Sequence, residues 1–291
     1  MGIKQTGRKI GWILCITMCL AGLLFVGLSS GGLGVPAAVR VPILLYHHIT
    51  EEVTGKDVEL SPETFELHME ALAKAGYTAV TFDQLVGYVE RGERLPERPV
   101  CITMDDGYLS NYELAWPILE RCGMKATVFL IGSCVGHAYY KDTEFPVTPY
   151  FSWEQGREML HSDVIDLQCH TYDLHQWEPF EPERPVRKNI LPLPGETEEA
   201  YTRVVTEDLR QFQRIYEAEL GRRAYVLAYP EGKYNELAER IVRAEGFSVT
   251  VSTDIHRENL LKRGERESLY ELGRINVEAD MTAEELLEQI E

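Results

Sequence analysis

Cysteine is scarce in this chain, with six in 291 residues, and two of them fall in an apolar N-terminal run. The other four show no Cys-x-x-Cys spacing: Cys101, Cys122, Cys134 and Cys169. This pattern excludes a disulfide-dense scaffold and a metal site built from paired cysteines. A metal site in this chain would therefore use oxygen and nitrogen donors.

Positive charge is scarce as well. Lysine and arginine number 29 against 47 acidic residues, which gives a net charge of −18. The first 39 residues hold only three charges, Lys4, Arg8 and Lys9, so removing these positives leaves −21 on residues 40–291. A body this acidic repels nucleic acid and anionic membrane surfaces, so neither is an expected partner. We interpret it as a soluble acidic surface, with attraction to cationic partners as the alternative.

The N-terminus has the pattern of an export segment. Its three positive charges precede an uncharged, largely apolar run over residues 10–28, as in a signal peptide. The run is also long enough to span a bilayer, with the positive end kept in the cytoplasm. We predict that residues 1–39 form a cleaved signal peptide or a membrane anchor. Residues 40–291 would then be exported, secreted or held at the cell surface, with membrane contact only through this segment.

Beyond residue 40, apolar runs typical of buried strands alternate with helical patterns. We predict strands over 41–46, 78–82, 100–104, 126–131, 164–169, 224–229, 248–252 and 272–277. Helices are predicted over 61–75, 82–91, 112–122, 153–161, 197–220, 236–245 and 283–290. Repeated strand–helix units with non-alternating strands are typical of an α/β parallel sheet or barrel, and seven or eight strands favour a barrel. The proline-rich stretch 177–195 is predicted to be a loop, either beside the site or a plain surface insertion.

Polar residues follow several predicted strands directly. His47 and His48 end the first strand, Asp105 and Asp106 end another, and His170 ends a third. The carboxyl ends of parallel strands meet on one side, so these side chains should share a site. Adjacent carboxylates at a strand end repel each other, and a metal ion would relieve one charge and leave the other as a base.

His170 and His175 are the natural co-ligands for such an ion. Five residues apart, their side chains would diverge on a regular helix, so this segment must be a loop or distorted turn. One carboxylate and two histidines around a divalent metal with an open position form a hydrolytic site in outline.

Three segments together resemble the polysaccharide deacetylases, carbohydrate esterase family four. Met104-Asp105-Asp106-Gly107-Tyr108 is similar to the first motif of that family, and His170 to His175 is similar to the second. Ala228-Tyr229-Pro230-Glu231-Gly232 is similar to the third. The resemblance covers about residues 40–290. It implies an irregular (β/α)7 barrel that hydrolyses N-acetyl groups of a polymer or oligomer containing N-acetylglucosamine (GlcNAc).

The wider spacing of the histidine pair and the early histidine are similar to the branch that deacetylates poly-β-1,6-N-acetylglucosamine in biofilms. A late Leu-x-His is absent, and Leu272-Gly273-Arg274-Ile275 occupies that region. The resemblance implies that Asp105 is the general base and His47 the general acid. It implies a divalent metal, Zn²⁺ first and Co²⁺, Ni²⁺ or Fe²⁺ as alternatives, held by Asp106, His170 and His175. Candidates for the oxyanion or substrate contacts are Tyr108, Tyr229 and Glu231.

The third motif departs from the family pattern, because Ala228 stands where an arginine is usual and Glu231 where a tyrosine is usual. Another group must therefore orient Asp105, and we expect Glu231 to raise the pKa of that carboxyl. Two other functions stay open: a peptidoglycan or chitooligosaccharide deacetylase, and a catalytically inactive module that binds glycan at the cell surface. The body is expected to be monomeric.

Overall fold

The computed structural model describes residues 2, 36–55, 58–141, 143–181 and 185–291. The chain divides into two units at Pro36, and the second, Ala37–Glu291, carries all the elements below. The predicted export segment lies almost wholly outside the described residues. Among the residues that are described, no helix combines the length and the apolar character needed to cross a membrane.

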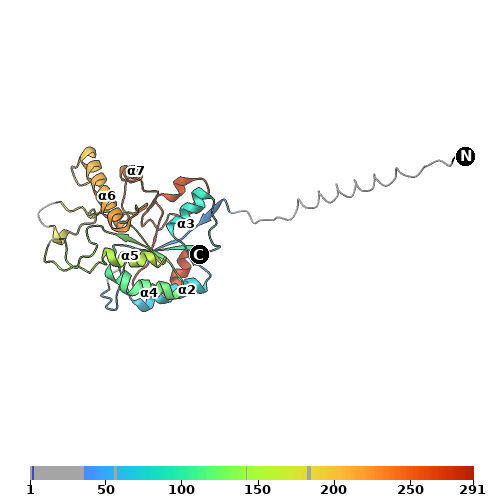
Figure 1. Ribbon diagram of the computed structural model, residues 1–291. Coiled ribbons are helices and arrows are strands. Elements are labelled where there is room, and N and C mark those ends of the chain that lie inside the picture. Colours follow the sequence, from blue (N-terminus) through green and yellow to red (C-terminus); the bar gives the residue numbers. More distant parts are fainter. Residues whose placement is uncertain (1, 3–35, 56–57, 142, 182–184) are drawn as a thin grey trace. The chain divides into compact units, whose positions relative to one another are not determined.

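A curled parallel sheet forms the centre of the second unit (Figure 1). Its strand order is β10-β9-β8-β7-β6-β2-β12, and β5 pairs with β6 beside this path. Leu272, just before β12, pairs in parallel with Val251 of β10, which links the two edges of the sheet. This arrangement agrees with the predicted irregular seven-stranded barrel. The strand bounds are β2 Ile43–Tyr46, β5 Thr78–Ala79, β6 Pro99–Met104, β7 Ala126–Leu130, β8 Ile165–Cys169, β9 Val226–Ala228, β10 Val249–Val251 and β12 Ile275–Asn276.

Helices surround the sheet, and most begin at a side-chain cap (Figure 1). Ser152 caps α5 and accepts the N–H of Gln155, whose side chain accepts in return from the N–H of Ser152. The bounds are α2 Pro62–Lys74, α3 Phe82–Val86, α4 Trp116–Cys122, α5 Trp153–His161, α6 Glu198–Leu220, α7 Glu236–Ala244 and α8 Ala283–Ile290. Shorter turns are η1 Gly87–Arg91, η2 Asn111–Ala115, η3 Glu178–Phe180, η4 Pro230–Gly232 and η5 Arg266–Leu269.

The central strands are buried on both faces, as their apolar runs predict. Every residue of β2, β6 and β7 is buried, because helices cover one face and the barrel interior the other. Two small strand pairs were not predicted. They are β1 Ala38–Arg40 with β11 Leu260–Lys262, antiparallel, and β3 His48–Ile49 with β4 Glu59–Leu60, parallel.

Candidate active site

The carboxyl ends of the central strands open into one cavity of about 740 Å³. β2 leads into His47 and His48, and β6 leads into Asp105 and Asp106. β8 leads into His170, and all of these residues line the cavity. Its other walls include Leu45, Val58, Glu59, Tyr108, Thr148, His175, Trp177, Glu231, Gly232, Thr253 and Asn276.

Three donor groups converge at the floor of this cavity. Among the described residues, Asp106, His170 and His175 each offer one ligand atom, and these atoms lie within 4.8 Å of one another. Asp106 Oδ1 lies 3.7 Å from His170 Nε2 and 3.9 Å from His175 Nε2. The same oxygen is buried and has no hydrogen-bond partner in the described part of the chain. A buried, unpaired carboxylate oxygen beside two imidazole nitrogens fits a divalent metal ion.

Backbone carbonyls orient both imidazoles. His170 Nδ1 lies 2.8 Å from Ala228 O, and His175 Nδ1 lies 2.7 Å from Lys188 O. A carbonyl oxygen can only accept, so each Nδ1 carries the proton and each Nε2 keeps its lone pair for a metal. Burial lowers the pKa of His170 to about 4, although Asp105 and Asp106 act in the opposite sense. His170 is therefore neutral at neutral pH, as a metal ligand must be.

The loop between the two histidines is folded so that they converge. Thr171 has a φ of 70°, in the left-handed region, and its hydroxyl accepts the N–H of Leu174 at 3.2 Å. The Asp208 carboxylate on α6 accepts the N–H groups of Tyr172 at 2.8 Å and Asp173 at 2.7 Å. This non-helical turn brings together two side chains that would diverge on a helix.

The first motif turns sharply at the end of β6. Asp106 and Gly107 both have positive φ, 72° and 86°. A Cβ on Gly107 would lie 2.9 Å from the Leu130 side chain, so glycine suits this position on both counts. A non-glycine residue in the left-handed region costs free energy, which the surrounding structure must offset.

Arg274 orients Asp105, and it is the residue that the sequence reasoning missed. Its guanidinium donates to Oδ1 at 2.6 Å and to Oδ2 at 2.8 Å, and both side chains are almost fully buried. Its Nε donates to Ser252 O at 3.1 Å. Gly273 precedes it because a Cβ there would lie 2.0 Å from Asp254 O. The only available signal was the Leu272-Gly273-Arg274-Ile275 segment, which marked the missing late histidine.

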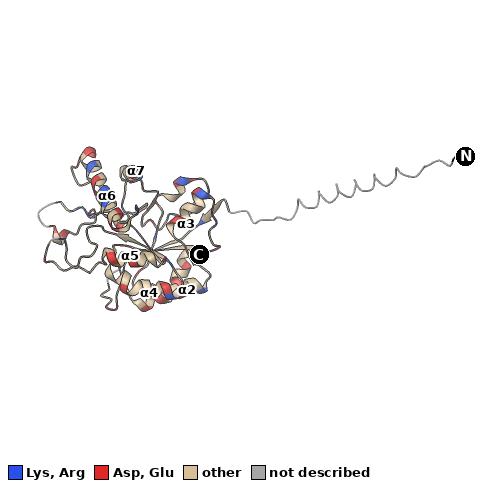
Figure 2. Ribbon diagram, viewed as in Figure 1, with Lys and Arg blue, Asp and Glu red and all other residues tan. Residues whose placement is uncertain are grey.

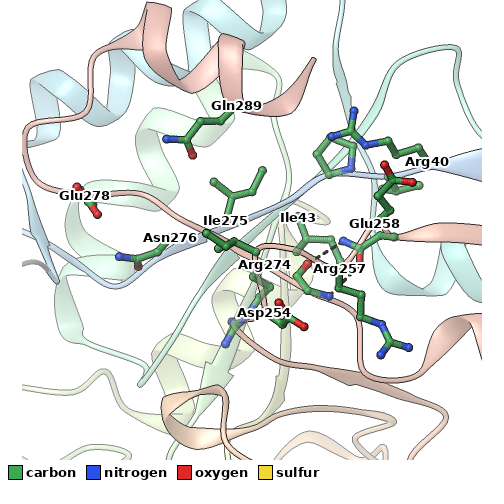
Figure 3. Close-up of a pocket in the computed structure, with 15 residues that line it drawn as sticks. Arg40, Ile43, Asp254, Arg257, Glu258, Arg274, Ile275, Asn276, Glu278 and Gln289 are labelled. Carbon is green, nitrogen blue, oxygen red and sulfur yellow. Dashed lines mark hydrogen bonds between the residues drawn. The ribbon is translucent and has the colours of Figure 1, made fainter.

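This ion pair overturns the expected effect of Glu231 on Asp105. Burial alone would raise the pKa of Asp105, but the charge of Arg274, together with His170, holds it well below its usual range. The Glu231 carboxylate instead accepts from Asn189 at 2.6 Å and pairs with Lys233 at 2.9 Å. Arg274 also lines a second cavity of about 350 Å³, shown in Figure 3.

His47 and Tyr108 both line the main cavity. The backbone carbonyl of His47 accepts from the Asn111 side chain at 2.9 Å, which fixes the chain at this point. The Tyr108 ring stacks on Tyr150 with centroids 5.3 Å apart. Burial and the nearby Asp106 carboxylate raise the pKa of Tyr108 well above its usual value, so its hydroxyl stays protonated and can donate.

Tyr229 and Glu231 were the two candidates from the third motif, and of these Glu231 lines the cavity, where its backbone has a φ of 55°. Tyr229 does not reach it, which corrects the prediction of a substrate contact. Its ring is fully buried, its hydroxyl donates to Glu239 on α7, and its N–H donates to Val251 O. Side chains alternate in direction along an extended chain, so Tyr229 points away from the cavity.

A parallel sheet with candidate metal donors at the carboxyl ends of its strands suits a hydrolase, and sequence comparison identifies the family. The family described as polysaccharide deacetylase matches residues 92–250, more than half of the chain. The chain belongs to the polysaccharide deacetylase family, whose members are hydrolytic N-deacetylases.

Particular relatives cover the chain only in part. YxkH of Bacillus subtilis (strain 168), whose name places it among polysaccharide deacetylases, is 28% identical over 215 residues, 74% of this chain and 65% of YxkH. The poly-beta-1,6-N-acetyl-D-glucosamine N-deacetylase of Staphylococcus aureus is 24% identical over 68% of this chain and 62% of its own length. The chain thus spans less than two thirds of these relatives. The structure of IcaB from Ammonifex degensii superposes with a TM-score of 0.69, at 26% identity, over 86% of this chain and 97% of that one.

Proposed function

We propose that this chain is a metal-dependent N-deacetylase of an exported GlcNAc polymer, with poly-β-1,6-N-acetylglucosamine as the preferred substrate. The observation that carries the proposal is the pairing of a carboxylate kept ionised by Arg274 with three metal donors beside it. A divalent ion bound there, with Zn²⁺ first and Co²⁺, Ni²⁺ or Fe²⁺ as alternatives, would polarise the acetamide carbonyl and acidify water.

Asp105 is the proposed general base. Its carboxylate lies 3.7 Å from His170 Nε2, beside the donor set, and stays ionised over the pH range of most enzymes. An ionised, oriented carboxylate can take the proton of the attacking water. The bidentate contact with Arg274 limits rotation of the Asp105 carboxylate, so the oxygen that accepts the proton keeps a fixed position relative to the attacking water.

His47 is the proposed general acid, because its side chain lines the same cavity from the neighbouring strand end. It would protonate the amine as the C–N bond breaks, so that the products are acetate and a glucosamine unit. A backbone N–H near Glu231 and the Tyr108 hydroxyl are the proposed donors to the carbonyl oxygen.

The substrate assignment rests on resemblance. The histidine pair has the wider spacing seen in the branch that acts on the β-1,6-linked polymer, and one relative is named for that activity. Residues 1–39 would direct residues 40–291 out of the cell as signal peptide or anchor. A peptidoglycan or chitooligosaccharide deacetylase is the alternative enzyme. A glycan-binding module would have no use for an ionised base beside a metal set.

Acetate release by the purified full chain tests the proposal. The protein is stripped of metal with a chelator, reloaded with Zn²⁺, and given β-1,6-linked GlcNAc oligomers, chitin oligomers and peptidoglycan in parallel. We expect release from the β-1,6-linked oligomers only after reloading, and none from Asp106→Ala. Asp105→Asn should bind Zn²⁺ and lose about 10²-fold or more in kcat. Full turnover by Asp105→Asn would exclude Asp105 as the general base. Metal binding without acetate release from any of the glycans would exclude the deacetylase function.

A further inference from the structure

Aromatic side chains gather beside the cavity on two loops. Phe180 lies at the centre: its ring centroid is 4.9 Å from Tyr140, 5.5 Å from Phe145 and 6.1 Å from Trp177. Tyr139 precedes Tyr140 on the same loop. We call these five residues the aromatic shelf: Tyr139, Tyr140, Phe145, Trp177 and Phe180.

The shelf continues the wall of the catalytic cavity. Trp177 and His175 line the cavity, and the same two residues line a small adjoining hollow with Tyr139 and Tyr140. Tyr139 is 54% exposed and Phe145 51%, which places them among the few large apolar side chains open to solvent in the described chain. Exposed aromatic rings next to a polar cavity are typical of a binding surface rather than of a core.

Buried and half-buried polar contacts hold the two loops together. Lys141 Nζ pairs with Asp173 at 2.8 Å and with Glu181 at 2.5 Å. The Tyr140 hydroxyl donates to the same Glu181 carboxylate at 2.9 Å, and Glu181 is buried. The exposed rings of the shelf therefore rest on a fixed base, so a ligand would not have to order them on binding.

We propose that the aromatic shelf binds sugar rings of the glycan that lie next to the residue being deacetylated. This inference rests on the proposed function, since the occupant is a neighbouring stretch of the same GlcNAc chain. A pyranose ring presents C–H groups on its faces and hydroxyls at its edge, and its faces can pack on aromatic rings. The sugar being deacetylated would lie at the metal donors within the cavity, while the following sugars would extend over Trp177 toward Tyr139 and Phe145. Productive binding should therefore depend on chain length.

The double variant Tyr139→Ala, Phe145→Ala tests the shelf in the Zn²⁺-loaded full chain. With a β-1,6-linked GlcNAc pentamer we expect KM to rise about tenfold with little change in kcat. With the dimer, too short to reach the exposed rings, kcat/KM should stay at the wild-type value. The pair Tyr139→Phe, Phe145→Tyr keeps both rings and should match the wild type. Leu67→Ala removes a side chain of similar exposure, 52%, on α2 and should leave kcat/KM for both dimer and pentamer unchanged.

The shelf proposal is wrong if the alanine pair loses kcat/KM equally for dimer and pentamer, or loses none for either. Binding measured by calorimetry on metal-free protein separates this proposal from the catalytic one. Tighter binding of pentamer than dimer, lost in the alanine pair, would support the shelf even if no acetate is released. Acetate release that is independent of chain length would support the deacetylase proposal and contradict the shelf proposal.

Discussion

Arg274 holds the two carboxylate oxygens of Asp105, a residue far from it in the sequence. It lies 169 residues from Asp105, yet its guanidinium meets both carboxylate oxygens inside the barrel. Arg274→Lys keeps the charge and removes the two-pronged contact, so Asp105 should lose its fixed orientation. We expect kcat to fall about 10²-fold, with Zn²⁺ content unchanged by metal analysis. Arg210→Lys, an exposed arginine paired with Glu245 on the surface, is the matched control. Wild-type kcat in Arg274→Lys would mean that its charge alone suffices.

Asp208 is a second residue whose effect reaches the site through the backbone. Burial raises its pKa to about 7, even though two backbone N–H groups favour the ionised form. The pKa is thus higher in the folded chain than in the unfolded chain, about 3.9, so the folded state binds the extra proton between these values. From this group, the free energy of unfolding should fall as pH rises from about 4 to 7, by about 1.4 kcal/mol per unit.

Asp208→Asn removes that titration. Both proteins are unfolded in urea across pH 5 to 8. The free energy of unfolding of the wild type minus that of Asp208→Asn should fall as pH rises toward about 7 and stay constant above it. An asparagine can accept only one of the two N–H groups well, so the histidine loop should also loosen. We expect Zn²⁺ affinity to fall about tenfold or more. A stability difference that does not vary with pH would show that Asp208 titrates near its ordinary value.

At the scale of elements, the loop that carries Tyr140 depends on Lys141. Lys141→Met would remove the ammonium group that pairs with the buried Glu181 carboxylate at 2.5 Å. The same ammonium pairs with Asp173, so its loss removes the positive charge held between two carboxylates, and we expect the loop to open and the thermal midpoint to drop. Limited proteolysis should cut near residues 137–150 in this variant and spare the wild type. Lys125→Met, whose partner Asp163 is exposed, should behave like the wild type in both assays.

The elements also differ in how well a sequence can predict them. Strands such as β6 and β7 are covered on both faces, and their continuous apolar runs mark them clearly. β3 and β4 have two residues each, so backbone pairing defines them and no local pattern does, whereas the two residues of β12 lie inside the strand predicted over 272–277. The same limit applies at the site. Asp106, His170 and His175 follow recognisable strands, but the Arg274 contact and the direction of Tyr229 depend on how distant segments meet.

At the scale of the whole molecule, the acidic surface bears on the product. Residues 40–291 carry a net charge of −21, and Figure 2 shows acidic residues spread over outer helices such as α2, α4 and α6. Each deacetylated sugar becomes an ammonium ion near neutral pH, so the proposed product turns into a polycation as the reaction proceeds. A negative field attracts such a chain, which favours retention of a partly deacetylated polymer.

Salt should therefore control product inhibition far more than substrate binding. The screening length falls from about 30 Å at 0.01 M salt to about 3 Å at 1 M, which removes long-range attraction between exposed charges. We expect a β-1,6-linked glucosamine oligomer to inhibit acetate release strongly at low salt and at least tenfold more weakly at high salt. The KM of the uncharged, fully acetylated oligomer of the same length should change little, because aromatic packing and hydrogen bonds dominate its binding. An equal salt response of the charged and uncharged oligomers would show that the acidic surface takes no part in holding the product.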